Sequence, residues 1–199
     1  MGTELNEVSY WSEDFTNLQL LGQTVANKEF EACRFIDCNF SDGVFRDCKF
    51  VDCEFIHCNL SLLTPDYSEF NNVTFKQSKL NGIDWTKISL SNLMASNPFQ
   101  FQQCLLNDNS FFAMQLNKLI ATDCKIHRVD FRDGDFTEAN FSDSEFDGSL
   151  FNNTNLTEAD FTDALEYDID INFNRVNKAK FSRVEAMRLL AHLGITLVD

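Results

Sequence analysis

The chain has 199 residues and a formal net charge of −15. This acidic excess argues against direct binding to nucleic acid or to an anionic membrane surface, because phosphate binding needs basic residues. No apolar run approaches the ~20 residues of a membrane span, and the first residues lack the basic and apolar regions of a signal peptide. We therefore expect a cytoplasmic protein with one domain.

A period of five residues organises most of the chain. Large apolar residues recur at every fifth position, most clearly at Phe30, Phe35, Phe40, Phe45, Phe50 and Phe55. Helices repeat every 3.6 residues and strands every 2, so neither explains this spacing. A chain that turns once per five residues does: four quintets close a square coil, and coils stack at strand spacing, ~4.8 Å. We expect about eight coils and a rod of roughly 40 Å.

Each quintet is named here by its large apolar residue, position i, which points inward together with a small residue at i−2. Positions i−1, i+1 and i+2 face water. Residues 1–12 precede the repeat and are expected to cap the first coil, since an open coil end exposes unpaired edges. Residues 13–181 form the repeat. Leu62–Asp66 is expected to replace one quintet with a corner or a small protrusion. An outward loop is expected because proline cannot donate to a paired ladder, and Thr64, Pro65 and Asp66 are its candidate contacts with a partner.

The repeat changes phase once. Position i falls on multiples of five as far as Leu90 and is shifted by one from Phe101 onward. Ser96-Asn97-Pro98 is a turn signal, so we expect a bulge or kink near residues 91–100 that divides two coil stacks. After Phe161, Ile171, Val176 and Phe181 keep the phase, whereas Glu166 replaces an apolar residue.

The last segment, residues 182–199, has a helical pattern. Ser182 and Glu185 form a capping box that starts an α-helix, Gly194 ends it, and residues 195–198 predict a short strand. The apolar residues predict a homodimer contact; one alternative is that the helix only caps the last coil. The expected contact residues are Met187, Leu190, Leu193, Ile195 and Leu197.

All seven cysteines occupy i−2 positions, which predicts buried, reduced thiols that act as small apolar groups. One alternative is a disulfide between cysteines stacked twenty residues apart, which would need an oxidising compartment. A zinc site at Cys53, His57 and Cys58 is the sharper alternative. We disfavour it because His57 is at i+2 and faces outward while the thiols face inward. We therefore expect no metal and no cofactor.

Acidic residues gather in the second half of the repeat. With twenty residues per coil, Asp123, Asp143 and Asp163 share one outward column, Glu138 and Glu158 share the next, and Asp135 and Asp160 flank them. A regular ladder of carboxylates, near the 3.4 Å rise of a nucleic-acid strand, resembles a phosphate backbone. The alternative is a solvated face whose charge serves solubility.

No nucleotide-binding, metalloprotease or serine-hydrolase motif occurs in the sequence. Paired carboxylates are frequent, but acid–base catalysis needs one of them in an apolar pocket. A rod with a filled interior and convex faces predicts no such pocket, so we expect no catalytic residues and no enzymatic activity.

The motif A/C-(D/N)-(L/F)-x-x, present as CRFID, CNFSD, CKFVD, ANFSD and ADFTD, resembles the pentapeptide-repeat family. This resemblance implies a right-handed quadrilateral parallel β-helix over about residues 13–181. Three further features resemble the Qnr-type quinolone-resistance group and the self-immunity proteins against gyrase poisons: the single phase slip, the C-terminal helix with the tail LGITLVD, and the acidity.

Members of that group are described as dimeric rods that mimic duplex DNA, bind type II topoisomerases (DNA gyrase or topoisomerase IV) and protect them from drugs. The resemblance implies topoisomerase binding through Asp123, Asp135, Glu138, Asp143, Glu158, Asp160 and Asp163. The projecting loops of Gram-negative Qnr proteins have no counterpart beyond Leu63–Asp66, so topoisomerase binding is better supported than drug protection. The alternative is a repeat scaffold for a different protein partner.

Overall fold

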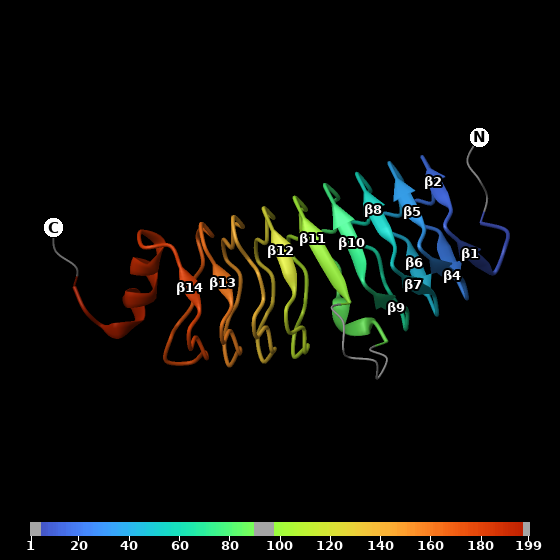
Figure 1. The fold of residues 1–199 in the computed structure, drawn as a ribbon. Helices are drawn as coiled ribbons and strands as arrows, with labels where there is room; N and C mark the ends of the chain where they lie inside the picture. The colour runs from blue at the N-terminus through green and yellow to red at the C-terminus, as the bar shows by residue number, and fades with distance from the viewer. Residues whose placement is uncertain (1–4, 90–97, 197–199) are drawn as a thin grey trace.

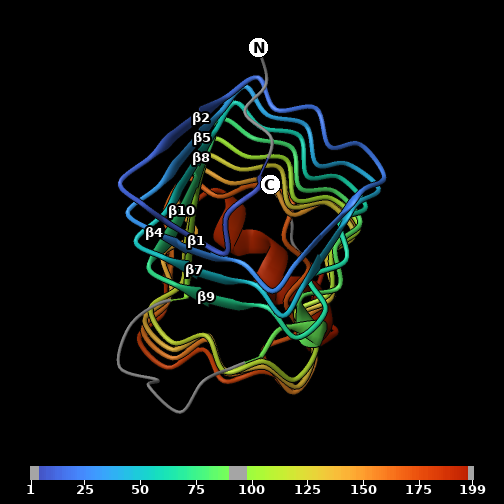
Figure 2. The same cartoon turned by 90° about the vertical axis from the view of Figure 1, so that its right-hand side faces the viewer.

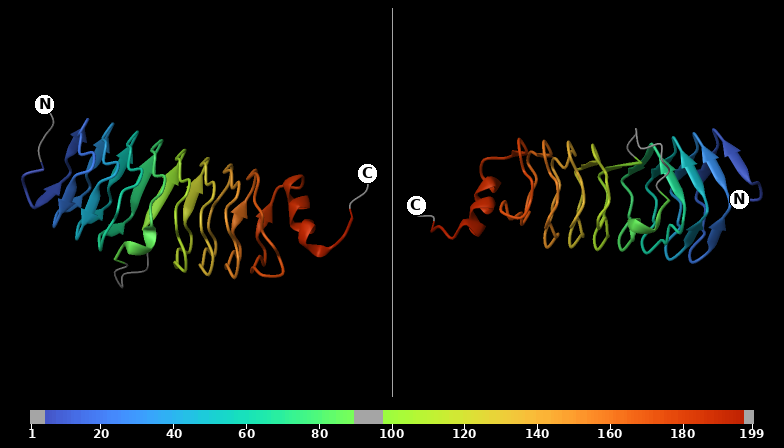
Figure 3. Two further views of the ribbon diagram at one scale, coloured as in Figure 1. Left: turned by 180° about the vertical axis from the view of Figure 1, so that it is seen from behind. Right: turned by 90° about the horizontal axis from the view of Figure 1, so that it is seen from below.

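The computed structural model describes residues 5–89 and 98–196 of the chain. They form a right-handed parallel β-solenoid of about eight turns, and a short helix closes its C-terminal end. The first and last described residues lie at opposite ends of the rod (Figures 1 and 3), and the outline along the axis is four-sided (Figure 2). The predicted quadrilateral β-helix is confirmed. None of the described helices has the length and apolar character that crossing a lipid bilayer requires.

Short strands mark the faces of the solenoid. They are β1 (Ser9–Trp11), β2 (Asp14–Thr16), β3 (Thr24–Ala26), β4 (Glu29–Glu31), β5 (Arg34–Ile36), β6 (Val44–Arg46), β7 (Lys49–Val51), β8 (Glu54–Ile56), β9 (Glu69–Asn71), β10 (Val73–Lys76), β11 (Phe99–Gln102), β12 (Ile120–Thr122), β13 (Asp160–Phe161) and β14 (Lys180–Phe181). Two 3₁₀ helices, η1 (Trp85–Lys87) and η2 (Glu185–Leu193), complete the elements.

One face runs the whole length of the rod, and we call it the long face. It contains the six-stranded parallel sheet with the order β12-β11-β10-β8-β5-β2. Single bridges from Ile120 to Asn140 and from Asn140 to Asp160 continue it to β13 and β14. A second sheet, β1-β4-β7-β9, forms the adjoining face of the first stack.

The inward phenylalanines form stacked columns behind these faces. On the long face Phe15, Phe35, Phe55 and Phe75 pair in register, twenty residues apart. Their rings stack with centroid separations of 5.1, 4.6 and 5.1 Å. All are buried, so these period-five residues belong to the core of the rod.

The phase change lengthens one coil to twenty-six residues. Phe75 pairs with Phe101, whereas the N–H of Ser89 still bonds to Ser68 O at 2.9 Å in the ordinary register. The six additional residues therefore lie between Ser89 and Pro98. The bulge predicted near 91–100 falls mostly on residues 90–97, which lie outside the described residues.

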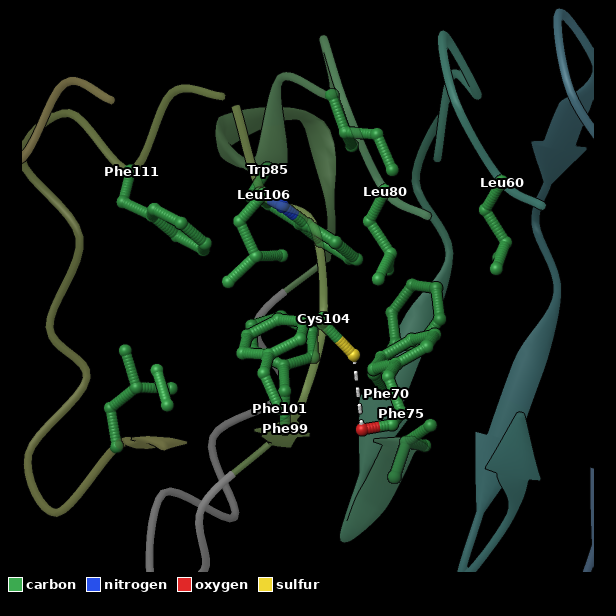
Figure 4. Close-up of a cluster of buried hydrophobic side chains, with 14 of the residues drawn as sticks. Leu60, Phe70, Phe75, Leu80, Trp85, Phe99, Phe101, Cys104, Leu106 and Phe111 are labelled. Carbon is green, nitrogen blue, oxygen red and sulfur yellow. Dashed lines mark hydrogen bonds between the residues drawn. The ribbon is translucent and has the colours of Figure 1, made fainter. Parts of the chain in front are cut away.

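The ring stacking and the inner hydrogen bonds of the core continue across this longer coil. Trp85 is fully buried and its ring stacks on Phe111 at 6.1 Å. The thiol of Cys104 donates to Phe75 O at 3.4 Å across the phase change (Figure 4).

The corners explain why position i+2 is rich in aspartate and asparagine. These residues adopt a left-handed backbone conformation, with φ of 54° at Asp123 and 59° at Asp143. Asp and Asn tolerate this region better than most residues. Lys118 and Lys178 also adopt it, with φ of 64° and 58°, so the corners accept a long basic side chain.

Position i−2 carries a hydrogen-bonding role in addition to its small size. Its thiol or hydroxyl donates to the carbonyl oxygen of an inward residue one coil earlier, as from Cys48 to Val25 O (3.3 Å) and from Cys58 to Phe35 O (3.3 Å). Thr154 does the same with Phe131 O at 3.1 Å. These side chains satisfy buried backbone groups that the ladder leaves unpaired.

Two boundaries differ from the sequence prediction. The repeat starts before residue 13, because β1 pairs in register with β4 and Tyr10 is buried over Phe30. At Pro65 the predicted outward turn is wrong. Pro65 is buried in the inward position, Thr64 bridges Val44, and the N–H of Asp47 bonds to Asp66 O at 3.0 Å. The coil accepts proline because only one ladder donor is lost.

The last coil also departs from the prediction. Tyr167 and Ile169 are buried, and Ile169 bridges Phe151, so the expectation that Ile171 keeps the phase is wrong. The chain shortens this face because Glu166 takes a corner conformation with φ of 59°.

The terminal helix is a 3₁₀ helix rather than the predicted α-helix. Its N-cap is Val184, with no side-chain cap, so the predicted capping box is wrong. Ser182 Oγ instead donates to Asp163 Oδ1 at 2.8 Å. Gly194, with φ of 66°, ends the helix as predicted. Ile195 and Thr196 are not in a strand, and residues 197–199 lie outside the described part of the chain.

Candidate partner-binding surface

Six of the seven predicted acidic residues lie on or beside the long face of the second stack. Asp123, Asp143 and Asp163 are successive corners at one edge, which we call the Asp edge. Glu138 and Glu158 are corners at the other, which we call the Glu edge. Asp160 lies in β13 between them.

Asp135 lies on the adjoining face. It is half-buried and accepts hydrogen bonds from the backbone N–H and hydroxyl of Thr137 and from Asn155. Burial raises its pKa, but these hydrogen bonds outweigh that effect, so the pKa of Asp135 lies below its ordinary value. Asp135 is therefore fixed by hydrogen bonds to Thr137 and Asn155.

The Glu edge is partly neutralised by lysines one coil away. Lys118 lies 3.6 Å from Glu138, and Lys178 lies 2.8 Å from Glu158. The Lys178 hydrogen bond lowers the pKa of Glu158. Asp160 is paired in the same way with Lys180 at 2.8 Å. One shallow depression of mixed charge is lined by Glu138, Glu158, Asp160, Lys178 and Lys180.

The Asp edge has no such counter-ions. Asp123 Oδ2 accepts from Gln103 Nε2 at 2.9 Å, and Asp163 Oδ1 accepts from the Ser182 hydroxyl at 2.8 Å. Among the described residues, no ion pair includes Asp123, Asp143 or Asp163. Their charges repel at strand spacing, so the Asp edge concentrates unpaired negative charge.

The segment Thr64–Asp66 offers no projecting contact. It follows the wall of the coil, and Asp66 Oδ2 lies 3.9 Å from Arg46 Nη2 on a neighbouring strand. The structure does not bring this segment together with the acidic edges, because it belongs to the first stack and to another face.

The residues predicted to form a dimer contact lie at the C-terminal end of the rod. Met187, Leu193 and Ile195 are exposed, by 54%, 42% and 52%, and Leu190 is half-buried. Leu189, on another side of η2, packs against the core. Leu197 lies outside the described residues. The helix thus covers the last coil with one side and presents apolar side chains with the other.

The cysteines and histidines do not converge. All seven thiols are buried and free, as predicted. His57 faces outward, where Nε2 lies 2.7 Å from Gln77 Oε1 and Nδ1 lies 3.6 Å from Asp37. Within residues 5–89 and 98–196, no group of three potential metal ligands is gathered.

Reasoning from the sequence noted the interleaved lysines Lys118 and Lys178 on the Glu edge, but it missed the counter-ion Lys180 of Asp160 on the long face. Glu158 and Lys178, and likewise Asp160 and Lys180, are twenty residues apart in the chain. The coil period alone could have identified these pairs. Their effect is to leave the Asp edge as the most strongly acidic part of the predicted surface.

Comparisons with known proteins agree with this architecture. Family models for a pentapeptide repeat region and for eight copies of pentapeptide repeats match residues 28–100 and 124–163. Together they match more than half of the chain. No curated protein sequence gave a significant match.

Solved structures give matches at the level of the fold. A trypsin-treated variant of QnrB1, a plasmid-mediated fluoroquinolone resistance protein, has a TM-score of 0.66 and 19% identity, covering 96% of this chain and 99% of that chain. HetL, which is involved in heterocyst differentiation regulation in the cyanobacterium Nostoc, has a TM-score of 0.61 and 15% identity, covering 86% and 84%. At these identities the likeness concerns the fold alone.

Proposed function

Since the chain belongs to the pentapeptide-repeat family, we propose that it binds a type II topoisomerase, DNA gyrase or topoisomerase IV, as a mimic of duplex DNA. The Asp edge would enter the basic surface where the enzyme holds DNA. Binding would protect the enzyme from quinolones or from another gyrase poison. The protein would act in the cytoplasm as a homodimer, without catalysis.

The observation that carries this proposal is the unpaired charge at Asp123, Asp143 and Asp163. The left-handed corner favours Asp, but it favours Asn equally, so the backbone does not account for the charge. A surface selected for stability alone would place lysine between carboxylates one strand spacing apart, as occurs at Lys178. Three successive unpaired aspartates are instead suited to a basic partner.

The overall form supports the proposal at a coarser level. The rod matches QnrB1 over nearly its whole length, and QnrB1 is a fluoroquinolone resistance protein. Pentapeptide-repeat proteins with this architecture include HetL as well, so the fold admits several partners.

A scaffold for a different protein partner is the second candidate. The ion pairs of Glu138, Glu158 and Asp160 with lysines favour it, because they reduce the acidity of the surface. On that reading the charge of −15 serves solubility.

A supercoiling assay with purified gyrase tests the proposal. The protein is titrated with and without a quinolone, and the double reversal Asp123→Lys/Asp143→Lys is compared with it. We expect inhibition without the drug, or rescue in its presence, and at least a tenfold loss of either effect in the reversal. The same titration with topoisomerase IV tests the alternative target.

The matched control is Asp47→Lys/Asp133→Lys. These two aspartates occupy left-handed corners on the diagonally opposite edge, and Asp133 accepts from Asn153 Nδ2 at 2.7 Å much as Asp123 accepts from Gln103. The control carries the same change of net charge and should keep its effect on gyrase. Equal loss in both variants would indicate a dependence on net charge, and no loss in either would exclude mimicry through the Asp edge.

A further inference from the structure

The helix η2 closes the C-terminal end of the rod. Leu189 packs against the core, and the helix lies across the end of the solenoid (Figure 2). Beneath this end Tyr167 is fully buried, and its hydroxyl has no hydrogen-bond partner. What holds the helix in place therefore decides whether the last coil stays covered.

The break in the repeat creates a docking point for the helix. Tyr167 and Ile169 point inward, so the intervening Asp168 and the following Asp170 point outward on the same side of an extended segment. His192 of η2 meets both carboxylates. Its Nε2 lies 2.7 Å from Asp168 Oδ1, and its Nδ1 lies 3.8 Å from Asp170 Oδ2.

This arrangement depends on the protonation state of the imidazole. A neutral imidazole has one N–H donor and one acceptor nitrogen, whereas the imidazolium has two donors. With a carboxylate opposite each nitrogen, only the imidazolium attracts both. A neutral ring would turn a lone pair toward one of the two carboxylates.

Glu185 and Arg188, the other charged residues of η2, pair with each other. Glu185 Oε2 accepts from Arg188 Nε at 2.6 Å and from the backbone N–H of Glu166 at 3.3 Å. Histidine is the side chain whose ordinary pKa lies closest to neutral pH, so His192 is the group of η2 whose charge changes in the physiological range.

We propose that His192 is a pH-sensitive latch that fastens η2 to the last coil when it is protonated and releases the helix when it is neutral. The latch concerns the folding of this chain and does not depend on the identity of a partner. The hydrogen bond from His192 to Asp168 raises the pKa of the imidazole above its ordinary value. A raised pKa means that the stabilisation is complete below pH ~6.5 and is lost as the pH rises through the raised value.

An NMR titration of the full chain, combined with limited proteolysis, tests the latch. The imidazole Cε1–Hε1 signal of His192 reports its pKa directly. Trypsin cleavage after Arg188, followed by mass spectrometry and normalised to a peptide substrate at each pH, reports release of the helix. We expect a pKa above 6.5 and a normalised cleavage rate at least threefold higher at pH 8.5 than at pH 6.

The test variants are His192→Gln and Asp168→Asn/Asp170→Asn. The first should cleave at a rate that does not change with pH, and the second should return the His192 pKa to about 6.5. His127→Gln is the matched control, because His127 faces the single carboxylate of Glu145 at 3.3 Å, away from η2. It should behave like the unmodified protein.

Two results would overturn the latch. One is a His192 pKa at or below 6.5 in the unmodified protein. The other is pH-dependent cleavage that persists in His192→Gln, which would assign the release to a different group.

Discussion

The hydroxyl of Ser78 accepts a hydrogen bond from the backbone N–H of Cys58, twenty residues earlier, at 2.9 Å. The same hydroxyl lies 3.3 Å from Phe55 O and 2.8 Å from Lys76 O. It therefore connects two coils inside the rod. Cys104 occupies the next i−2 position of this inner column and donates to Phe75 O, so a thiol and a hydroxyl perform the same task.

Replacing Ser78 should separate the polar role from the size requirement. Ser78→Ala leaves a buried N–H and a buried carbonyl without their partner, so we expect a loss of about 1–3 kcal/mol in the free energy of unfolding. Ser78→Cys restores a donor and should lose less than half as much. Chemical denaturation followed by circular dichroism measures both, and equal losses would show that the hydroxyl matters only by its volume.

The buried thiols should make the rod sensitive to alkaline pH. Burial raises the pKa of Cys53 to about 12. An unfolded thiol ionises near pH ~8.5, so the stabilisation is complete below that pH and falls as the pH rises toward 12. Cys53 alone should lose about 2 kcal/mol of folding free energy by pH 10.

Burial raises the pKa of Tyr167 to about 12 as well. Ionisation of Tyr167 therefore also lowers the stability of the fold, at a still higher pH than ionisation of Cys53. Denaturation midpoints at pH 7.5, 9 and 10 should therefore decrease in that order. In Cys53→Ala the decrease should be smaller, whereas the conservative surface change Ser9→Ala should leave it unchanged. If the denaturation midpoint decreases with pH as much in Cys53→Ala as in the unmodified protein, the alkaline sensitivity does not come from the Cys53 thiol.

The exposed side of η2 should control the oligomeric state. Met187→Glu/Leu193→Glu places two charges on the proposed contact, so we expect the mass in sedimentation equilibrium to fall from that of a dimer to that of a monomer. The control is Phe112→Glu, because Phe112 is an exposed apolar residue on a side face of the rod. A monomeric unmodified protein, or a dimer that survives the double change, would reject this contact.

Removing the lysines of the Glu edge should strengthen binding to a basic partner, whereas replacing aspartates of the Asp edge with lysine should weaken it. In Lys118→Ala/Lys178→Ala the partners of Glu138 and Glu158 are removed, and the surface becomes more negative. If the rod binds a basic surface, association with gyrase should be several-fold faster at low salt, with a steeper dependence on salt. Lys49→Ala/Lys87→Ala changes the net charge equally on other faces and serves as the control. Slower association in the first variant would argue against DNA mimicry.

The period of five made the core predictable, because a large residue every fifth position has few geometric solutions. The stacked column Phe35–Phe55–Phe75 follows directly from it. The hydrogen bonds of Cys58 and Ser78 did not, since small size was the visible property of position i−2. At the last coil three alternating apolar residues, Tyr167, Ile169 and Ile171, fit two registers equally, and only packing chose between them.

The positions of the acidic residues on the surface were predictable from the sequence. The net negative charge at each position was not. The columns of Asp143 and Glu158 follow from the coil period. Their difference depends on whether a lysine follows twenty residues later and reaches the carboxylate, which Lys178 does for Glu158. The left-handed corner adds a second reason for aspartate that hydrophobic periodicity does not reveal.

The corners also bear on how such a chain can diversify. A side chain at i+2 leaves the coil at its outermost point, so exchanging it leaves the stacked rings and the inner hydrogen bonds untouched. The charges and side chains along an edge can therefore change during evolution by single substitutions, and each intermediate protein still folds. Two descendants of one ancestral rod could come to recognise different partners with their interiors nearly unchanged.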